Sequence, residues 1–372
     1  MANLDKLRTL IPLEELEQEA QQQIYYALNL DFLKVLAVMP DCHVGYSLPI
    51  GGVALLDGVI SPSYVGYDIG CGMCCIMSGE HVSYIYGKEN YIFDDIYEKI
   101  PVGFNSREKG LDYKSFKSAS GDKKLDKKVA KRLWVQIGTL GSGNHFIEIG
   151  EAYSRGSLSI TIHSGSRNIG HSIVSYWMKL SKNVDKDLPN GFLHLDGEYG
   201  KAYLQDMKFA QEYALYNRKI MMEKVLEILG LHHMYIRDMI NENHNHAIVQ
   251  SDGTVLHRKG ATPADKGQLG VIPGNMKDGV YVTKGLGNDE YLSSASHGAG
   301  RRFSRRKAKE TIDLDDFIKD MEGIVCKADK STLDESRFAY KDISDVMSRQ
   351  EGIVIEVVDY IKPIINIKGV SK

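Results

Sequence analysis

The chain has 372 residues, of which 43% are hydrophobic and 26% are charged. These fractions are typical of globular proteins, and a chain of this length can bury a sizeable core. The formal net charge is −3, so the composition excludes a global positive field for nucleic acid. Any surface that binds nucleic acid must therefore be local.

Targeting signals and disulfides are not indicated by the sequence. The N-terminal residues show no apolar run behind a basic start, which argues against a secretory signal. Apolar runs also stay shorter than the roughly 18 residues of a membrane span. The five cysteines are an odd number, and four of them fall between positions 42 and 75. We therefore expect reduced thiols in a cytoplasmic protein without a membrane segment.

The first half of the chain predicts one helix and two regions of strands. Residues 12–29 predict a helix, with proline at its start and acids in the first turn. Over residues 35–77, short apolar runs alternate with turn-rich segments, which predicts strands joined by loops. Residues 109–128 are polar and predict an exposed segment. A second strand-and-loop region is expected over 134–170, with strands at 134–140, 145–149 and 158–163.

The second half begins with the clearest helix. Apolar residues recur at helical spacing from about Gly200 to Leu229, and Gly230 is a natural stop. Residues 231–243 predict a second helix. The last third returns to short strands and glycine loops, followed by a helical tail and a terminal strand over 353–369.

The organisation of the chain favours one domain. The sequence shows no internal repeat and no linker of low complexity, and its motifs are scattered from residue 41 to residue 369. A site built from such distant motifs would draw both halves together. We therefore expect a mixed α/β fold that forms a single compact domain over residues 1–372, with a deep cleft that contains metal.

The first candidate site lies in the glycine-rich loop VGYDIGCGM at residues 65–73. Asp68 and Cys71 are a carboxylate and a thiol that could reach one metal ion or two. The alternative is a turn aspartate beside a buried cysteine. Cys74 and Cys75 follow, but a structural zinc site usually needs a second ligand pair and none appears. These two cysteines are expected in the core.

Histidines supply further candidate ligands. His145 lies in GSGNHFIEI, His163 in TIHSGSRNIGH, and His244 and His246 in NENHNHAIV. A lone histidine at the end of a strand is usually structural, but each of these lies in a loop rich in glycine or asparagine. Imidazole, carboxylate and thiolate together suit manganese, zinc or iron.

A third element is SASHGAGRRFSRRKAK. His297 is followed by Gly298, Gly300 and Arg301, which would let backbone and guanidinium approach a phosphate together. Six of the nine residues over 301–309 are basic; such a run is either a solvated helix face or a track for phosphates. The chain has no Walker A sequence and no lysine in a KxDG setting, so a covalently activated nucleotide would need another nucleophile.

The motifs taken together resemble one family. MPDCHVGYSLPIGG, VGYDIGCGM, GTLGSGNHFIEI, IHSGSRNIGH, HRKGA, IPGNM, SHGAGRRFSRRKAK, AYKDI and IKG occur in the order of the RtcB-type RNA ligase family and span residues 39–369. The resemblance implies a mixed α/β fold with two manganese ions. Asp68, Cys71 and His145 would bind one ion, and His163 and His244 the other, with Cys71 bridging both. His297 would be the nucleophile that attacks the α-phosphorus of GTP.

The resemblance also implies a reaction and its partners. RNA with a 3′-phosphate or a 2′,3′-cyclic phosphate would be joined to a 5′-hydroxyl through a histidine–GMP intermediate, in some relatives with the help of an activating protein. Arg167 and the basic run, including Arg302, Arg305 and Arg306, are candidates for binding the RNA. The expected guanylate contacts, besides His297, are Asn144, Glu148, His244, Asn245, Pro273, Gly274, Asn275, Met276, Gly298, Ala299, Gly300, Arg301, Tyr340 and Lys368.

Three positions depart from the family pattern: Asn275 where serine is common, Ser47 where glycine is common, and Arg337 near a usual proline. None of them removes an expected metal ligand or His297, although Asn275 could alter a phosphate contact. Two alternatives remain open. The chain could be a dinuclear metal phosphodiesterase or cyclic-phosphate hydrolase without guanylation, or a non-catalytic relative that binds RNA.

Overall fold

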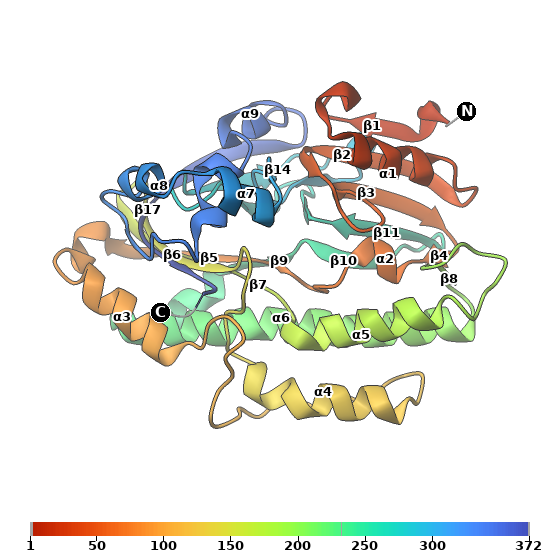
Figure 1. The fold of residues 1–372 in the computed structure, drawn as a ribbon, viewed down its shortest axis with the longest axis horizontal. Helices are drawn as coiled ribbons and strands as arrows, with labels where there is room; N and C mark the ends of the chain where they lie inside the picture. Colours follow the sequence, from red (N-terminus) through yellow and green to blue (C-terminus); the bar gives the residue numbers. More distant parts are fainter. Residues whose placement is uncertain (1–2, 232, 371–372) are drawn as a thin grey trace.

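The computed structural model describes residues 3–231 and 233–370. Two β-sheets lie above a layer of helices, and the chain passes directly from one sheet to the other (Figure 1). The mixed α/β class expected from the sequence is confirmed.

The first sheet contains the N-terminal strands. Strands β2 and β3 are almost wholly buried, and α1 (Gln18–Leu28) packs against β2 with Ile24 and Leu28 in the core. The helix expected from residue 12 begins later, because Leu13–Glu15 form a separate 3₁₀ turn. The strand order is β1 (Leu7–Thr9), β2 (Leu33–His43), β3 (Ile50–Asp57), β11 (Thr254–Lys259) and β10 (Asn245–Val249).

The second sheet is larger and carries the terminal strand predicted over 353–369, which the structure places at Ile355–Lys368. A short strand, β16 (Val325–Cys326), pairs with it in parallel. The strand order is β13 (Leu269–Pro273), β14 (Val280–Gly285), β17 (Ile355–Lys368), β6 (Phe146–Ala152), β7 (Ser157–Ser164), β5 (Gly72–His81) and β9 (Ile240–Asn243).

Helices cover the lower face in Figure 1. The helix expected from Gly200 to Leu229 is confirmed as α6 (Glu198–Leu229), and Gly230 ends it in the left-handed conformation at φ 67°. Helix α5 packs on α6, and α4 packs on α5 as the outermost layer. The other helices are α2 (Pro62–Val65), α3 (Glu89–Lys99), α4 (Lys123–Gln136), α5 (Arg167–Leu180), α7 (Arg305–Thr311), α8 (Leu314–Asp320) and α9 (Ile343–Ser348).

Two short strand pairs complete the architecture. One consists of β4 (Val59–Ile60) and β8 (Leu193–His194), and the other of β12 (Ala261–Pro263) and β15 (Ser294–Ser296). The second pair leads the chain to residue 297. No helix among the described residues is both long and apolar enough to cross a lipid bilayer.

Three predictions about local structure are wrong. The stretch 134–140 is not a strand, since Trp134–Gln136 form the last turn of α4, whose residues Leu125, Val129 and Leu133 are buried at helical spacing. Because Phe116 and Leu125 are buried, the segment 109–128 is only partly exposed. Helix α5 also begins at Arg167, inside the expected strand-and-loop region.

The prediction of a helix over 231–243 is also wrong for the residues that the structure describes there. Residues His233–Asp238 form a 3₁₀ helix, and Ile240–Asn243 form strand β9. The edge of β5 explains the change, because Gly72 to Cys75 pair with Asn243 to Ile240 in an antiparallel ladder. Strand pairing supplied by the tertiary structure overrides the local helical pattern.

Candidate metal centre and nucleotide cavity

Four neighbouring strands bring the five predicted metal ligands to one edge of the second sheet. In the antiparallel order β6-β7-β5-β9, the start of β6, the end of β7, the start of β5 and the end of β9 lie together, with Phe146 opposite His163 and Gly72 opposite Asn243. The ligands lie at these strand ends or in the adjoining loops. We call them the donor cluster: Asp68, Cys71, His145, His163 and His244.

The donor atoms are in close contact. Cys71 Sγ lies 3.2 Å from His163 Nε2 and 3.5 Å from His145 Nε2. His145 Nε2 is 3.1 Å from an oxygen of Asp68, and the Nε2 atoms of His163 and His244 are 3.4 Å apart. The structure therefore brings all five residues together.

Hydrogen bonds to backbone carbonyls determine which imidazole nitrogens of His145 and His163 could bind a cation. His145 Nδ1 lies 2.9 Å from the carbonyl oxygen of Leu140, and His163 Nδ1 lies 3.3 Å from that of Asn144. A carbonyl only accepts, so each Nδ1 carries the proton and each Nε2 presents a lone pair. These lone pairs face one another and the sulfur, an arrangement that a bound cation would satisfy. The donor set fits a metal ion, but its role as ligands stays a prediction.

Burial determines the protonation of the cluster. It lowers the pKa of His163 and His244 well below the ordinary value, and neighbouring positive groups lower it further. Burial also raises the pKa of the Cys71 thiol, and the charge of Asp68 adds to this. For Asp68, burial acts to raise the pKa, but a hydrogen bond and positive charge from His145, present when its Nε2 is also protonated, lower it overall. A bound cation would reverse the preference of Cys71 and favour its thiolate.

Glycine makes room for this cluster. A side chain at Gly165, directly after β7, would overlap the Asp68 carboxylate. The next turn is unusual because Arg167 begins α5 at a positive φ of 58°. Its guanidinium donates to Thr139 Oγ1 at 3.1 Å and to the Gly103 carbonyl at 3.0 Å. Arg167 therefore ties loops together beneath the cluster, and its predicted contact with RNA stays a prediction.

His297 lies beside the donor cluster, with its ring centroid 4.8 Å from that of His244. Its Nδ1 is 2.7 Å from Asp41 Oδ2, and its backbone N–H donates to the same oxygen at 3.2 Å. Asp41 lies on β2 and is fully buried. It therefore holds the Nδ1 proton, so the neutral ring presents the lone pair of Nε2; the role of His297 as the nucleophile stays a prediction. Asp41 was not assigned from the sequence, although it lies within the MPDCHVG motif.

A cavity of about 290 Å³ opens at His297. His43, Ile50, Phe146 and Asn366 contribute to its wall and were not assigned from the sequence. The glycine loop after His297 approaches β2 closely, since a side chain at Gly300 would overlap the Asp41 backbone. The predicted guanylate residues that line the cavity are Asn144, Pro273, Gly274, Asn275, His297, Gly298, Ala299, Gly300, Arg301, Tyr340 and Lys368.

Other predicted guanylate residues lie behind the cavity wall. Asn245 donates to the Asp68 carbonyl and accepts from the Gly260 N–H, so it fixes the loop of the donor cluster. Met276 is buried in a core cluster with Phe317. Contact of these residues with a nucleotide stays a prediction.

Glu148 is buried next to the cavity wall and accepts a hydrogen bond of 2.9 Å from Asn366. Burial raises the pKa of Glu148 to about 8, against the lowering effects of Asn366 and Lys368.

Asn275, which stands where serine is common in the family, forms hydrogen bonds within its own loop. Its side-chain oxygen accepts from the backbone N–H groups of Lys277 and Asp278. These hydrogen bonds hold residues 275–278 in a turn.

An ion-pair cluster that the sequence did not reveal lies in the wall of the cavity. Glu335 is buried, and its carboxylate contacts Arg301 at 3.3 Å, Arg305 at 2.6 Å, Tyr340 at 2.7 Å and Lys368 at 3.1 Å. Burial acts to raise the pKa of Glu335, but these cations lower it below its ordinary value. We call this group the Glu335 cluster. The only sequence signal was an acidic residue shortly before AYKDI.

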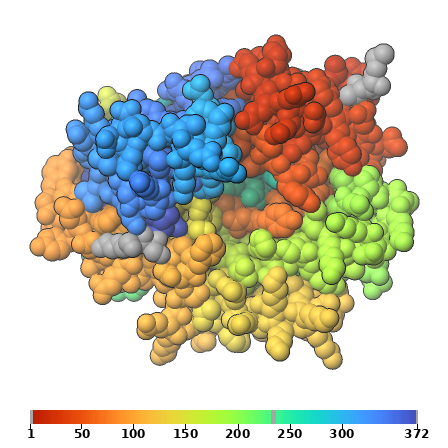
Figure 2. All heavy atoms as spheres, in the orientation of Figure 1, coloured from red at the N-terminus to blue at the C-terminus, as the bar shows by residue number. Residues whose placement is uncertain are grey.

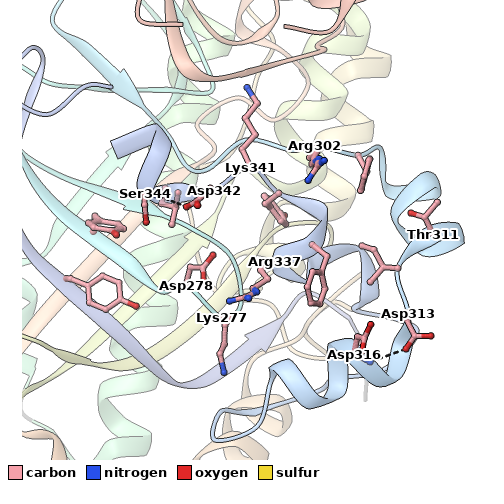
Figure 3. Close-up of a pocket in the computed structure, with 17 residues that line it drawn as sticks. Lys277, Asp278, Arg302, Thr311, Asp313, Asp316, Arg337, Lys341, Asp342 and Ser344 are labelled. Carbon is pink, nitrogen blue, oxygen red and sulfur yellow. Dashed lines mark hydrogen bonds between the residues drawn. The ribbon is translucent and has the colours of Figure 1, made fainter. Parts of the chain in front are cut away.

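The basic residues over 301–309 fall into two groups, those paired with the Glu335 cluster and those directed to other partners or to solvent. Arg305 also binds Asp334 at 2.9 Å, whereas Arg306 is exposed and pairs with Glu310. Arg302 is exposed and borders a larger hollow of about 930 Å³ that shares Tyr340 with the cavity (Figure 3). Arg337 also lines this hollow and pairs with Asp320 at 3.4 Å. None of the donor cluster lines the larger hollow.

The chain is similar to known proteins over nearly its whole length. A family model described as "tRNA-splicing ligase RtcB" matches residues 23–121 and 114–369. The RNA-splicing ligase RtcB of Escherichia coli strain K12 is 34% identical over 388 aligned residues, which cover 95% of each chain. The tRNA-splicing ligase RtcB of Nanoarchaeum equitans is 29% identical, over 91% of this chain and 88% of its own. This chain belongs to the RtcB family.

Proposed function

We propose that this protein is a GTP- and manganese-dependent RNA ligase. It joins RNA that ends in a 3′-phosphate or 2′,3′-cyclic phosphate to RNA with a 5′-hydroxyl. One observation carries the proposal: His297, with Nδ1 held by Asp41, lies between the donor cluster and a cavity lined by the glycine loops of the family. Membership of the RtcB family supports the same activity.

The first step transfers GMP to the protein. His297 Nε2 attacks the α-phosphorus of GTP, a P–N bond forms, and the bond to the leaving pyrophosphate breaks. Asp41 orients the ring and stabilises the positive charge that the imidazole gains. Asp68, Cys71, His145, His163 and His244 would hold the two manganese ions, whose positive charge would offset the charge on the phosphate oxygens.

The following steps use the RNA ends. A cyclic phosphate is hydrolysed to a 3′-phosphate, whose oxygen then attacks the GMP phosphorus and releases His297. The 5′-hydroxyl attacks the activated RNA phosphate, and GMP leaves as the new phosphodiester forms. Arg302, Arg305 and Arg306 contribute positive charge near the cavity for the RNA backbone.

The cavity wall has the groups that a guanylate needs. Glycine loops at 273–275 and 297–300 line the cavity, and the backbone N–H groups of Gly298, Ala299 and Gly300 would bind phosphates. Glu148, in its ionised form, would accept hydrogen bonds from the guanine edge. Lys368 would add a donor, while Arg301 and Tyr340 close the wall.

The test is a mass measurement after incubation with GTP and Mn²⁺. The parent protein gains the mass of one GMP, and His297→Ala gains none. His194→Ala, which removes an exposed histidine far from the cavity, serves as the matched control and retains the adduct. An RNA joining assay with defined 3′-phosphate and 5′-hydroxyl ends completes the test.

The alternatives give different outcomes in the same assays. A cyclic-phosphate hydrolase converts the cyclic end to a monophosphate, yet it forms no GMP adduct and joins no RNA. A non-catalytic relative binds RNA and contains almost no metal. Either result in the parent protein would contradict the ligase proposal.

We also propose that residues 1–372 fold as one domain in the cytoplasm. A single domain unfolds in urea in one transition, whether tryptophan fluorescence or circular dichroism is recorded. Two separate transitions would contradict this part of the proposal.

A further inference from the structure

Three aromatic rings contact one another at the surface. Tyr46 is 61% exposed and Tyr67 is 38% exposed, and their ring centroids lie 5.7 Å apart in an edge-to-face arrangement. Tyr67 stacks on the exposed ring of His171, with the centroids 5.2 Å apart and the planes 29° from parallel. We call these three side chains the aromatic stack. Large rings that remain exposed in contact with one another often mark a binding surface.

The aromatic stack adjoins the donor cluster. Tyr67 directly precedes Asp68 in the chain, and His171 lies one turn along α5 from Arg167. Tyr46 lies in the loop between β2 and β3, three residues after His43, which lines the nucleotide cavity. Segments from three parts of the chain thus place the rings at the margin of the candidate site.

Exposure shows from which side the donor cluster can be reached. The side chain of Asp68 is 32% exposed, whereas that of His145 is 6% exposed. Cys71, His163 and His244 are buried. Figure 2 shows one face of the molecule hollowed between the N-terminal and C-terminal parts of the chain. Asp68 is the most exposed member of the donor cluster, so a second substrate would meet the cluster most readily at Asp68, beside the aromatic stack.

The chemistry of the aromatic stack suits nucleobases. Aromatic rings bind unpaired bases by stacking and tolerate any base, because every base has a π face. The groove on the far side of Tyr46 is lined by Glu19 and Tyr26, and a carboxylate there disfavours a continuing phosphate backbone. The surface therefore suits a few bases at the end of a strand.

We propose that the aromatic stack binds the terminal, unpaired bases of the RNA ends that are joined. This inference rests on the proposed ligase function, because it takes RNA as the substrate of the donor cluster. It adds a base-binding subsite formed by Tyr46, Tyr67 and His171. The subsite favours single-stranded ends over blunt duplex ends and has no strong sequence preference.

The first experiment measures binding of a labelled ten-nucleotide single-stranded RNA with a 3′-phosphate, by fluorescence anisotropy in the presence of Mn²⁺. Tyr46→Ala and Tyr67→Ala each weaken binding about tenfold, the effect of losing one stacked base. Tyr46→Trp and Tyr67→Phe bind with the affinity of the parent protein, because any aromatic ring can stack on a base. Tyr153→Ala removes an 83% exposed tyrosine at the opposite end of β6 and leaves the affinity unchanged.

The second experiment needs no substitution in the protein. RNA that lacks the bases of its last two nucleotides binds the parent protein about a hundredfold more weakly than intact RNA, because two stacked bases are lost. With Tyr67→Ala the same comparison gives a loss of only about tenfold, since one of the two tyrosines is already absent. Equal affinity of the parent protein for intact and abasic RNA would overturn the inference.

The two proposals fail in different ways. If the parent protein forms a GMP adduct and joins RNA, but binds abasic and intact RNA equally, the ligase stands and the aromatic stack has no role in binding bases. If the parent protein forms no adduct and joins no RNA, the ligase proposal fails first. GMP-adduct formation by Tyr67→Ala also reports whether the loop before Asp68 still folds.

Discussion

Two clusters of polar side chains border the cavity at His297, and they differ in how their charged and polar atoms are paired. In the Glu335 cluster, one carboxylate is surrounded by two guanidinium groups, an ammonium and a phenol, so opposite charges are already paired. In the donor cluster, imidazole nitrogens of His163 and His244 face each other at 3.4 Å and also face the sulfur of Cys71. The charges of the first cluster are already paired, whereas the facing donor atoms of the second are an arrangement that a cation would satisfy.

This difference explains what each cluster contributes. Ion pairs of the Glu335 cluster hold Arg301, Tyr340 and Lys368 in place, which would reduce the entropy cost of binding the proposed nucleotide. The donor cluster instead has facing donor atoms, so binding of the proposed metal ions would both stabilise the fold and prepare the site. Substitutions in and beside the two clusters test this contrast.

Removing the sulfur tests the dependence of the donor cluster on metal. The parent protein gains about 2.7 kcal/mol of unfolding free energy when Mn²⁺ is present at a hundred times its Kd. Cys71→Ala loses this gain, and RNA joining falls to background. Urea unfolding with and without Mn²⁺ measures both variants. Cys74→Ala, a core substitution three residues away, lowers stability but retains the gain.

Removing one charge beside His297 tests how the nucleophile is held. Asp41→Asn slows GMP-adduct formation by roughly 10³–10⁴-fold, because the amide no longer favours the proton on Nδ1 or stabilises the positive ring. The Mn²⁺-dependent gain in stability remains, since Asp41 is not among the donors. A rate of adduct formation close to that of the parent, measured by rapid quench, would show that Asp41 does not orient His297.

Neutralising the centre of the Glu335 cluster tests its preorganisation. Glu335→Gln leaves the buried Lys368 and the partly buried Arg301 less well paired and costs about 3–5 kcal/mol of unfolding free energy. The KM for GTP in adduct formation rises roughly tenfold, since Arg301 and Lys368 lose their fixed positions. The stabilisation by Mn²⁺ persists. Glu310→Gln breaks only an exposed pair with Arg306 and changes stability by less than about 0.5 kcal/mol.

A buried acid beside the cavity gives the smallest and most pH-dependent effect. The pKa of Glu148 is raised by burial to about 8, so the folded protein keeps this proton after the unfolded chain has released it. Its stabilising contribution is complete below the unfolded pKa and is lost as pH rises through about 8. Urea unfolding at acidic and alkaline pH should therefore show the parent losing stability relative to Glu148→Gln on the order of a few kcal/mol. Parallel pH curves for both proteins would contradict this.

Much of the fold was predictable where local pattern and tertiary structure agree. Helix α6 was recognised because its apolar residues recur at helical spacing and Gly230 ends it. Strand β17 was recognised from its β-branched run. The errors at 134–140 and 231–243 arose where short apolar runs suit a helix or a strand equally, and the neighbouring element decided between them.

The candidate site shows the same division. Residues in glycine-rich motifs, such as Asp68, Cys71 and His297, were recognisable because few structural roles require those residue types in such loops. Asp41 and Glu335 escaped notice, since a lone acid in a sequence shows neither its burial nor its partners. The aromatic stack was equally hidden, because Tyr46, Tyr67 and His171 come from three separate segments.

The available chemical groups can be read from the sequence alone: a carboxylate, a thiol and imidazoles in loops rich in glycine, in the order of one family. Which of these groups meet depends on the tertiary structure, because strands β6, β7, β5 and β9 bring residues from 68 to 244 to one edge of a sheet. The tertiary structure also determines which carbonyl accepts a hydrogen bond from Nδ1 of His145 and of His163. It likewise brings Glu335 to the buried or partly buried cations Lys368 and Arg301. These choices depend on contacts between distant segments, and no local pattern encodes them.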